Sequence, residues 1–174
     1  GDVAGCICDS PNPVQGARSY PLGSMRYRAL ASPDFVARYF ANGVTPHALR
    51  QAPAVVFGPD DRLQHRYLAR YGVAPPFPHR VCPSAEGFVG LALAGLGYGM
   101  VPERQAEREL HEGRLQEIEA GPHLANGSLV DLSPGCVIDV PLYWHHWRQG
   151  GKVLDAMTDH LLQISDTWLA PLPL

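Results

Sequence analysis

Residues 81–103, with the sequence VCPSAEGFVGLALAGLGYGMVPE, decide the fold class of this chain. The segment predicts a strand, a helix, a tight glycine turn and a second strand. Ser84 stands at the N-cap of the helix, and apolar residues recur at helical spacing from Phe88 onward. Gly95 can end the helix because glycine adopts the left-handed conformation at little steric cost. Residues 97–101 are short and apolar, as in a buried parallel strand. The segment is therefore predicted to be a βαβ unit.

Strands and helices are expected to alternate along most of the chain, which indicates an α/β fold. Pro102 can open a helix, because a proline at the first helical position lacks an N–H that would be unpaired there. Ser32 and Thr45 each precede a proline and are expected to be N-caps. The apolar patterns predict strands at residues 3–8, 19–31, 54–57 and 137–147, and helices at residues 33–40, 46–49, 62–71, 103–112 and 153–164.

The composition describes a globular chain of 174 residues, enough for one domain or two small lobes. No run approaches the roughly 20 apolar residues of a membrane helix, and no signal peptide is visible, so a cytoplasmic location is expected. The formal net charge of −3 argues against nucleic-acid binding by this segment. The chain opens on Gly1 rather than Met, and we expect it to be a piece of a longer protein.

The four cysteines, Cys6, Cys8, Cys82 and Cys136, include no C-x-x-C pair, which is weak support for a zinc or thioredoxin-like site. They are interpreted as small thiols in a reducing cytosol. Because Cys6 and Cys8 lie two residues apart in an apolar, strand-like run, one of them is expected to face each side of the sheet. The sequence therefore predicts neither a metal site nor a cofactor.

Motifs for catalysis are also lacking. Cys82 could pair with one of eight histidines, but there is no nucleophile motif such as G-x-S-x-G. His145 and His146 are neighbours on a predicted strand and point to opposite faces, so they cannot simply chelate one ion. The run GLGYG lacks the third glycine and the acidic residue of a dinucleotide site. The chain is interpreted as a non-enzyme.

Four runs, in order along the chain, resemble one family. They are PLGSMRYRALASP from Pro21, DDRLQHR from Asp60, EGFVGLALAGLGYGMVPE from Glu86 and DVPLYWHHW from Asp139. Together they resemble the effector-binding domain of LysR-type transcriptional regulators, in the branch that senses lysine and arginine. The resemblance implies a two-lobed fold like that of periplasmic binding proteins, switched by a small effector, in a protein that forms dimers.

The resemblance also implies a division of the chain. Residues 25–139 would form a complete second lobe, whereas residues 1–24 and 140–170 would form part of the first lobe. DNA would be bound only through a winged helix-turn-helix domain outside this chain. Residues 104–135 depart from the family, because residues 109–121 can be laid over residues 123–135 where the family has one such unit. A duplication and a coincidence between two similar helix ends both explain this match.

Polar residues at the expected carboxyl ends of the strands form the candidate effector site, because open α/β sheets bind ligands there. Carboxylates would hold the cationic end of a basic amino acid, and Ser84 with its helix N-terminus would hold the carboxylate. The alternative is that these residues only cap helices. The candidate residues are Asp9, Asp60, Asp61, Gln64, Ser84 and Glu86. A second interpretation of the whole chain is a solute-binding protein that feeds a transporter.

The chain alone is predicted to bind promoter DNA no better than background, because its net charge is negative and its arginines are scattered. An electrophoretic shift assay at low salt checks this, with a basic DNA-binding domain as the positive control. A sequence-specific shift at nanomolar protein would contradict the prediction.

Overall fold

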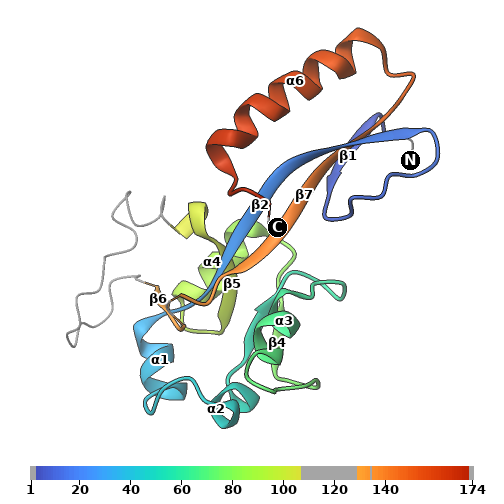
Figure 1. Ribbon diagram of the computed structural model, residues 1–174. Coiled ribbons are helices and arrows are strands. Elements are labelled where there is room, and N and C mark those ends of the chain that lie inside the picture. The colour runs from blue at the N-terminus through green and yellow to red at the C-terminus, as the bar shows by residue number, and fades with distance from the viewer. Residues whose placement is uncertain (1–2, 107–128, 134, 173–174) are drawn as a thin grey trace. The chain divides into compact units, whose positions relative to one another are not determined.

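The computed structural model describes residues 3–106, 129–133 and 135–172 (Figure 1). The helices are α1 (Pro33–Tyr39), α2 (Pro46–Gln51), α3 (Leu63–Ala69), α4 (Ala85–Leu93) and α6 (Gly151–Trp168). The strands are β1 (Gly5–Cys8), β2 (Ala17–Ala31), β3 (Ala54–Val56), β4 (His79–Val81), β5 (Tyr98–Pro102), β6 (Val130–Asp131) and β7 (Ile138–Trp147). The mixed α/β class predicted from the sequence is confirmed.

The chain divides into two compact units. The first unit contains Gly1–Arg26 and Asp139–Leu174, and the second unit contains Tyr27–Ile138. Both β2 and β7 contribute residues to the two units (Figure 1). Each unit has its own apolar core.

The sheet of the second unit is mixed. Its β2 pairs antiparallel with β5 and with the short β6, and β3 pairs in parallel with both β5 and β4. Because β4, α4 and β5 follow one another in the chain and both strands flank β3, the segment is a βαβ crossover, as predicted. Pro102 ends β5 opposite Tyr27, and helical backbone begins only at Glu103. The predicted helix start at Pro102 is wrong by one residue.

Helices cover both faces of this sheet. Successive strand residues point to opposite sides, so each strand contributes side chains to the packing on both faces. Val56 and Tyr98 pack on one face with the side chains of α1, α2 and α3, including Phe35, Leu49 and Tyr67. On the other face, Leu30, Val55 and Val101 pack against the α4 residues Phe88, Val89 and Ala92. The near-continuous apolar runs of β3 and β5 follow from this burial on both sides.

Three of the helices begin at caps that the sequence indicated. The hydroxyl of Ser32 accepts a hydrogen bond from the N–H of Phe35 at 3.3 Å. Thr45 accepts one from Ala48 at 3.2 Å, in the same way. Such contacts satisfy N–H groups that have no partner inside a helix, each at a stabilisation of about 1 kcal/mol.

In the first unit, β1 pairs antiparallel with β7, and α6 packs through Leu154 against Trp144. The indole N–H of Trp144 donates to the Thr158 hydroxyl at 2.9 Å, which joins β7 to α6. None of the helices in the described ranges combines the length and apolar character that crossing a bilayer requires. The predicted repeat, residues 109–121 over 123–135, falls mainly on residues 107–128, outside the described residues.

Replacing Gly99 by alanine is expected to destabilise the chain by about 1–3 kcal/mol, because the added methyl group overpacks the contact between β5 and α4. A Cβ at Gly99 would lie 2.9 Å from Cζ of the Phe88 ring and closer still to Cε1. Thermal unfolding followed by circular dichroism measures the effect.

Gly90→Ala is the matched control. Gly90 lies in α4, and a Cβ there meets no atom within 4 Å. This change should raise stability by about 0.5–1 kcal/mol, because alanine is the better helix former. Equal behaviour of the two variants would contradict the role assigned to Gly99.

Candidate functional site

A cavity of about 280 Å³ lies in the second unit, at the carboxyl ends of β3 and β5. This volume is near the lower end of the range for ligand pockets, about 300–1,000 Å³, and suits a small molecule. Its wall is mostly apolar and aromatic, with one carboxylate. The lining residues are Tyr27, Phe57, Asp61, Leu63, Ala85, Phe88, Met100, Pro102 and Gln105.

The carboxylate of Asp61 is held in place by the backbone. Its Oδ2 accepts a hydrogen bond from the N–H of Phe57 at 2.9 Å, and its Oδ1 accepts one from Leu63 at 3.0 Å. Asp61 therefore joins the end of β3 to Leu63, the first residue of α3, whereas the N-cap position of that helix is Arg62. An ionised carboxylate has several acceptor sites, so these two bonds leave it able to accept from a ligand.

Tyr27 is the electrostatic neighbour of Asp61 in the cavity wall. Burial raises the pKa of the Tyr27 phenol above its ordinary value, and the negative charge of Asp61 raises it further. The phenol is therefore neutral at physiological pH. The negative charge of Asp61 and the aromatic rings of Tyr27, Phe57 and Phe88 together suit an organic cation.

The other predicted site residues have different surroundings. Gln64 is fully buried, and its Nε2 donates to the carbonyl of Val55 at 2.6 Å, while its Oε1 has no hydrogen-bond partner in the described part of the chain. Ser84 caps α4 by accepting from the N–H of Gly87 at 3.2 Å. Asp60 and Glu86 are exposed.

Asp9 is also exposed and follows β1 in the first unit. Of the six predicted residues, Asp61 alone is among those described as lining the cavity. Ala85, the first residue of α4, also lines it, so the free N–H groups of the first turn of α4 lie at the cavity edge.

Sequence reasoning missed the aromatic part of the wall. Phe57 follows an apolar strand and Tyr27 lies in a strand of mixed character, so both resemble ordinary core positions. A signal for Phe57 was available, because the residue after a parallel strand lies at the edge where ligands bind. Tyr27 and Met100 carried no comparable signal.

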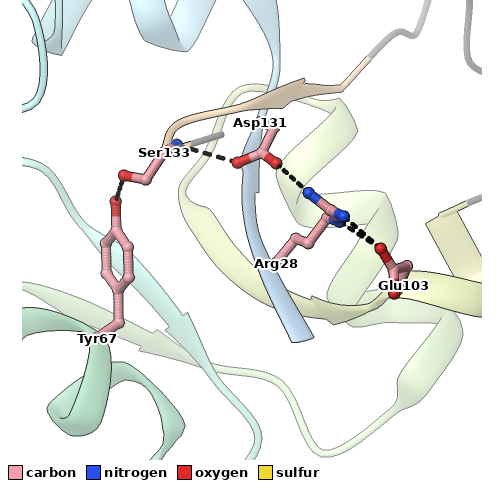
Figure 2. A network of polar contacts seen from close by, with 5 residues as sticks. All are labelled: Arg28, Tyr67, Glu103, Asp131 and Ser133. Atoms are coloured by element: carbon pink, nitrogen blue, oxygen red, sulfur yellow. Dashed lines mark hydrogen bonds and ion pairs between the residues drawn. The ribbon is translucent and has the colours of Figure 1, made fainter. Parts of the chain in front are cut away.

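A network of ion pairs and hydrogen bonds around Arg28 joins β2 to β6 and to the end of β5 (Figure 2). The Nε of Arg28 donates to Glu103 at 2.8 Å, a second nitrogen of the same guanidinium also bonds Glu103, and Nη1 donates to Asp131 at 3.0 Å. Arg28 follows Tyr27 in β2, and Glu103 follows Pro102 at the end of β5. The Arg28–Glu103 pair therefore holds β2 to the end of β5, and these two strands supply the cavity residues Tyr27 and Pro102. The Arg28–Asp131 pair joins β2 to β6.

The network continues from Asp131 towards α3 (Figure 2). The Oδ1 of Asp131 accepts from the N–H of Ser133 at 3.0 Å, and the Ser133 hydroxyl bonds the Tyr67 hydroxyl at 2.7 Å. Tyr71 also bonds the Ser133 hydroxyl. Burial raises the pKa of Tyr67, so its phenol stays protonated and can donate a hydrogen bond. Polar contacts thus connect β2, β5, β6 and α3.

Comparisons of this chain with known proteins all point to one family. Residues 2–164 match the family model of the LysR substrate binding domain. Two regulators named HTH-type transcriptional regulator ArgP are similar: that of Pseudomonas aeruginosa is 57% identical over 93% of this chain and 49% of its own length, and that of Pseudomonas fluorescens Pf0-1 is 54% identical over 99% and 53%. The chain spans about half the length of these curated relatives.

Solved structures agree with this family. The C-terminal domains of a LysR family protein from Agrobacterium tumefaciens superpose with a TM-score of 0.84 at 37% identity, over 98% of this chain and 76% of that one. Full-length LysG from Corynebacterium glutamicum, with bound effector Arg, has a TM-score of 0.76 at 33% identity, over 98% and 54%. The relatives are named transcriptional regulators, a family that is not enzymatic, in agreement with the interpretation of this chain as a non-enzyme.

Replacing Arg28 by methionine is expected to destabilise the chain by about 1–2 kcal/mol, because two half-buried carboxylates lose their shared cation. The control is Arg26→Met. The Arg26–Asp139 pair is longer, at 3.4 Å, and more exposed, so its loss should cost less than about 1 kcal/mol. Urea unfolding of both variants measures the difference, and a larger loss for Arg26→Met would contradict the role assigned to the network.

Proposed function

The chain belongs to the LysR substrate-binding domains, and from this premise we propose that it is the effector-sensing part of a transcriptional regulator that responds to arginine or lysine. The effector would occupy the cavity of the second unit. DNA binding would belong to another region of the whole protein, which we propose to be cytoplasmic and homo-oligomeric. The two-lobed, periplasmic-binding-protein-like fold is that of the family.

Asp61 is the observation that carries this proposal. It is an acidic side chain fixed by two backbone N–H groups in a wall that is otherwise largely apolar. A carboxylate beside apolar and aromatic surface attracts a cationic group, because a charge-assisted hydrogen bond is about twice as strong as one between neutral groups. The names of the relatives point to the same ligand class, since LysG is described with arginine as its bound effector.

The opposite end of the effector would face the N-terminus of α4. A helix N-terminus favours an anion through its free N–H groups and its dipole. Ala85 brings this terminus to the cavity, and Ser84 orders it as the cap. A basic amino acid would then lie with its carboxylate near α4 and its cationic end at Asp61. Glu86, Asp60, Gln64 and Asp9 stay candidates for further contacts.

Calorimetry with arginine, lysine and the neutral analogues citrulline and norleucine tests the proposal. The basic amino acids should bind, and Asp61→Asn should weaken them by about tenfold to a hundredfold, the cost of losing one charge-assisted bond. The neutral analogues should bind weakly to the wild-type chain and lose little in the variant.

Asp60→Asn is the matched control, because it removes an exposed neighbouring carboxylate that is not among the residues lining the cavity. Thermal unfolding of both variants separates lost binding from a lost cap. Equal binding of citrulline and arginine, or equal losses in the two variants, would overturn the assignment of Asp61. Failure of every basic amino acid to bind would count against the proposed effector class.

A further inference from the structure

Two cysteines and a histidine meet on one face of the first unit. β1 pairs antiparallel with β7 in a register that puts Cys6 opposite His145 and Cys8 opposite Tyr143. The ligand atoms of Cys6, Cys8 and His145 all lie within 4.8 Å of one another. None of these side chains belongs to the cavity or to the charged network of the second unit.

The register explains the cluster and corrects an expectation. Residues two apart on a strand point to the same face, so Cys6 and Cys8 are on one side, and the expectation that they face opposite sides is wrong. Residues directly opposite on paired strands also share a face, which adds His145. His146 points the other way and stacks on Tyr20 at 5.4 Å between ring centroids.

We propose that Cys6, Cys8 and His145 bind one thiophilic d¹⁰ cation, Zn²⁺ or Cu⁺. Thiolate sulfur and imidazole nitrogen are the ligands that these ions prefer, and two sulfurs with one nitrogen form a partial tetrahedral set. Water or another small ligand would complete the set for zinc. The proposal concerns the first unit and is independent of the amino-acid effector.

The spacing of the donor atoms fits such an ion. In a tetrahedral zinc site, bond lengths of about 2.3 Å to sulfur and about 2.0 Å to nitrogen separate a sulfur from a nitrogen by about 3.5 Å. The Sγ of Cys8 lies 3.5 Å from Nδ1 of His145 and 3.8 Å from its Nε2. Two bound sulfurs would be about 3.8 Å apart, so the two sulfurs need to close by at most about 1 Å and a sulfur–nitrogen pair by at most about 1.3 Å.

The surroundings of the three residues suit an accessible but sheltered ion. Cys6 is exposed, Cys8 is half-buried and His145 is buried, so an ion could enter from solvent and have its histidine ligand held by packing. The hydrogen-bond contacts found for the His145 ring in the described residues are both with the Cys8 sulfur. The Cys8 sulfur thus already lies close to both ring nitrogens, and it also lies 3.6 Å from the carbonyl oxygen of Ser10.

A disulfide is a poorer use of this pair. Two strand residues separated by one have Cα atoms about 6.7 Å apart, at the upper end of the range of about 4.4–6.8 Å that disulfides span. Both cysteines are free thiols here. An ion bridges two sulfurs that are further apart than the two atoms of a disulfide, so the extended backbone of β1 favours coordination.

Titration of the reduced 174-residue chain with Zn²⁺ against a chromophoric chelator tests the proposal. One ion per chain should bind, with a dissociation constant below about 1 µM. Co²⁺ in place of zinc should give a thiolate-to-cobalt charge-transfer band and the visible bands of tetrahedral coordination. A Cu⁺ arm, buffered with a copper chelator under anaerobic conditions, shows which of the two ions is preferred.

Variants assign the ligands. Cys6→Ser and Cys8→Ser change side chains on a short, partly exposed strand, and each should weaken binding by at least about a hundredfold. Cys82→Ser is the matched control, because Cys82 is a half-buried free thiol in the second unit and should leave binding unchanged. His145→Asn should abolish the cobalt bands, and circular dichroism checks its fold.

Four results would overturn the proposal. The first three are absence of binding of both ions at micromolar concentration, unchanged binding in Cys8→Ser, and loss of binding in Cys82→Ser. The fourth is a Cys6–Cys8 disulfide, detected by mass spectrometry, that persists in the presence of zinc and reductant. Arginine titrations of the same variants keep this test separate from the effector, because these substitutions leave the cavity residues intact.

Discussion

The contact between the Phe88 ring and the bare backbone of Gly99 is the constraint on which the second unit depends. Since residue 99 has no side chain, α4 packs directly onto β5 with the ring filling the space of a Cβ. The same closeness sets the cavity, because Ala85 and Phe88 on α4 line it together with Met100 and Pro102 on β5. A glycine in a buried strand thus shapes the wall of the cavity.

The sequence was sufficient for the elements whose signals are local. The Ser84 cap and the turn at Gly95 depend on neighbouring residues, and both were predicted correctly. Pro102 was misjudged by one residue, since its fixed φ suits the last residue of a strand as well as the first of a helix. Alternation along β5 could not show that Gly99 faces an aromatic ring, because that contact depends on the angle at which α4 crosses the sheet.

The site was less predictable because its parts are brought together by tertiary packing. Asp60 and Asp61 carry the same sequence signal, yet the turn directs only Asp61 to the N–H groups of Phe57 and Leu63. Arg28 meets Glu103 and Asp131 from 75 and 103 residues away, which no local pattern reveals. The pairing of the two thiols could have been predicted, since residues two apart on a strand, such as Cys6 and Cys8, lie on one face. The register between β1 and β7, which adds His145, could not be predicted from the sequence.

The two proposed sites use different chemistry, and this decides how they can interact. A carboxylate among aromatic rings recognises an organic cation by charge and shape, whereas thiolates and imidazole recognise a metal through coordinate bonds. A single carboxylate is a poor zinc site and thiols do not recognise a guanidinium, so each ligand is expected to prefer its own site. With free zinc and arginine buffered against each other, an influence of zinc on arginine binding would report a coupling between the two sites. Linkage makes such an influence reciprocal: the factor by which zinc changes the affinity for arginine is the factor by which arginine changes the affinity for zinc.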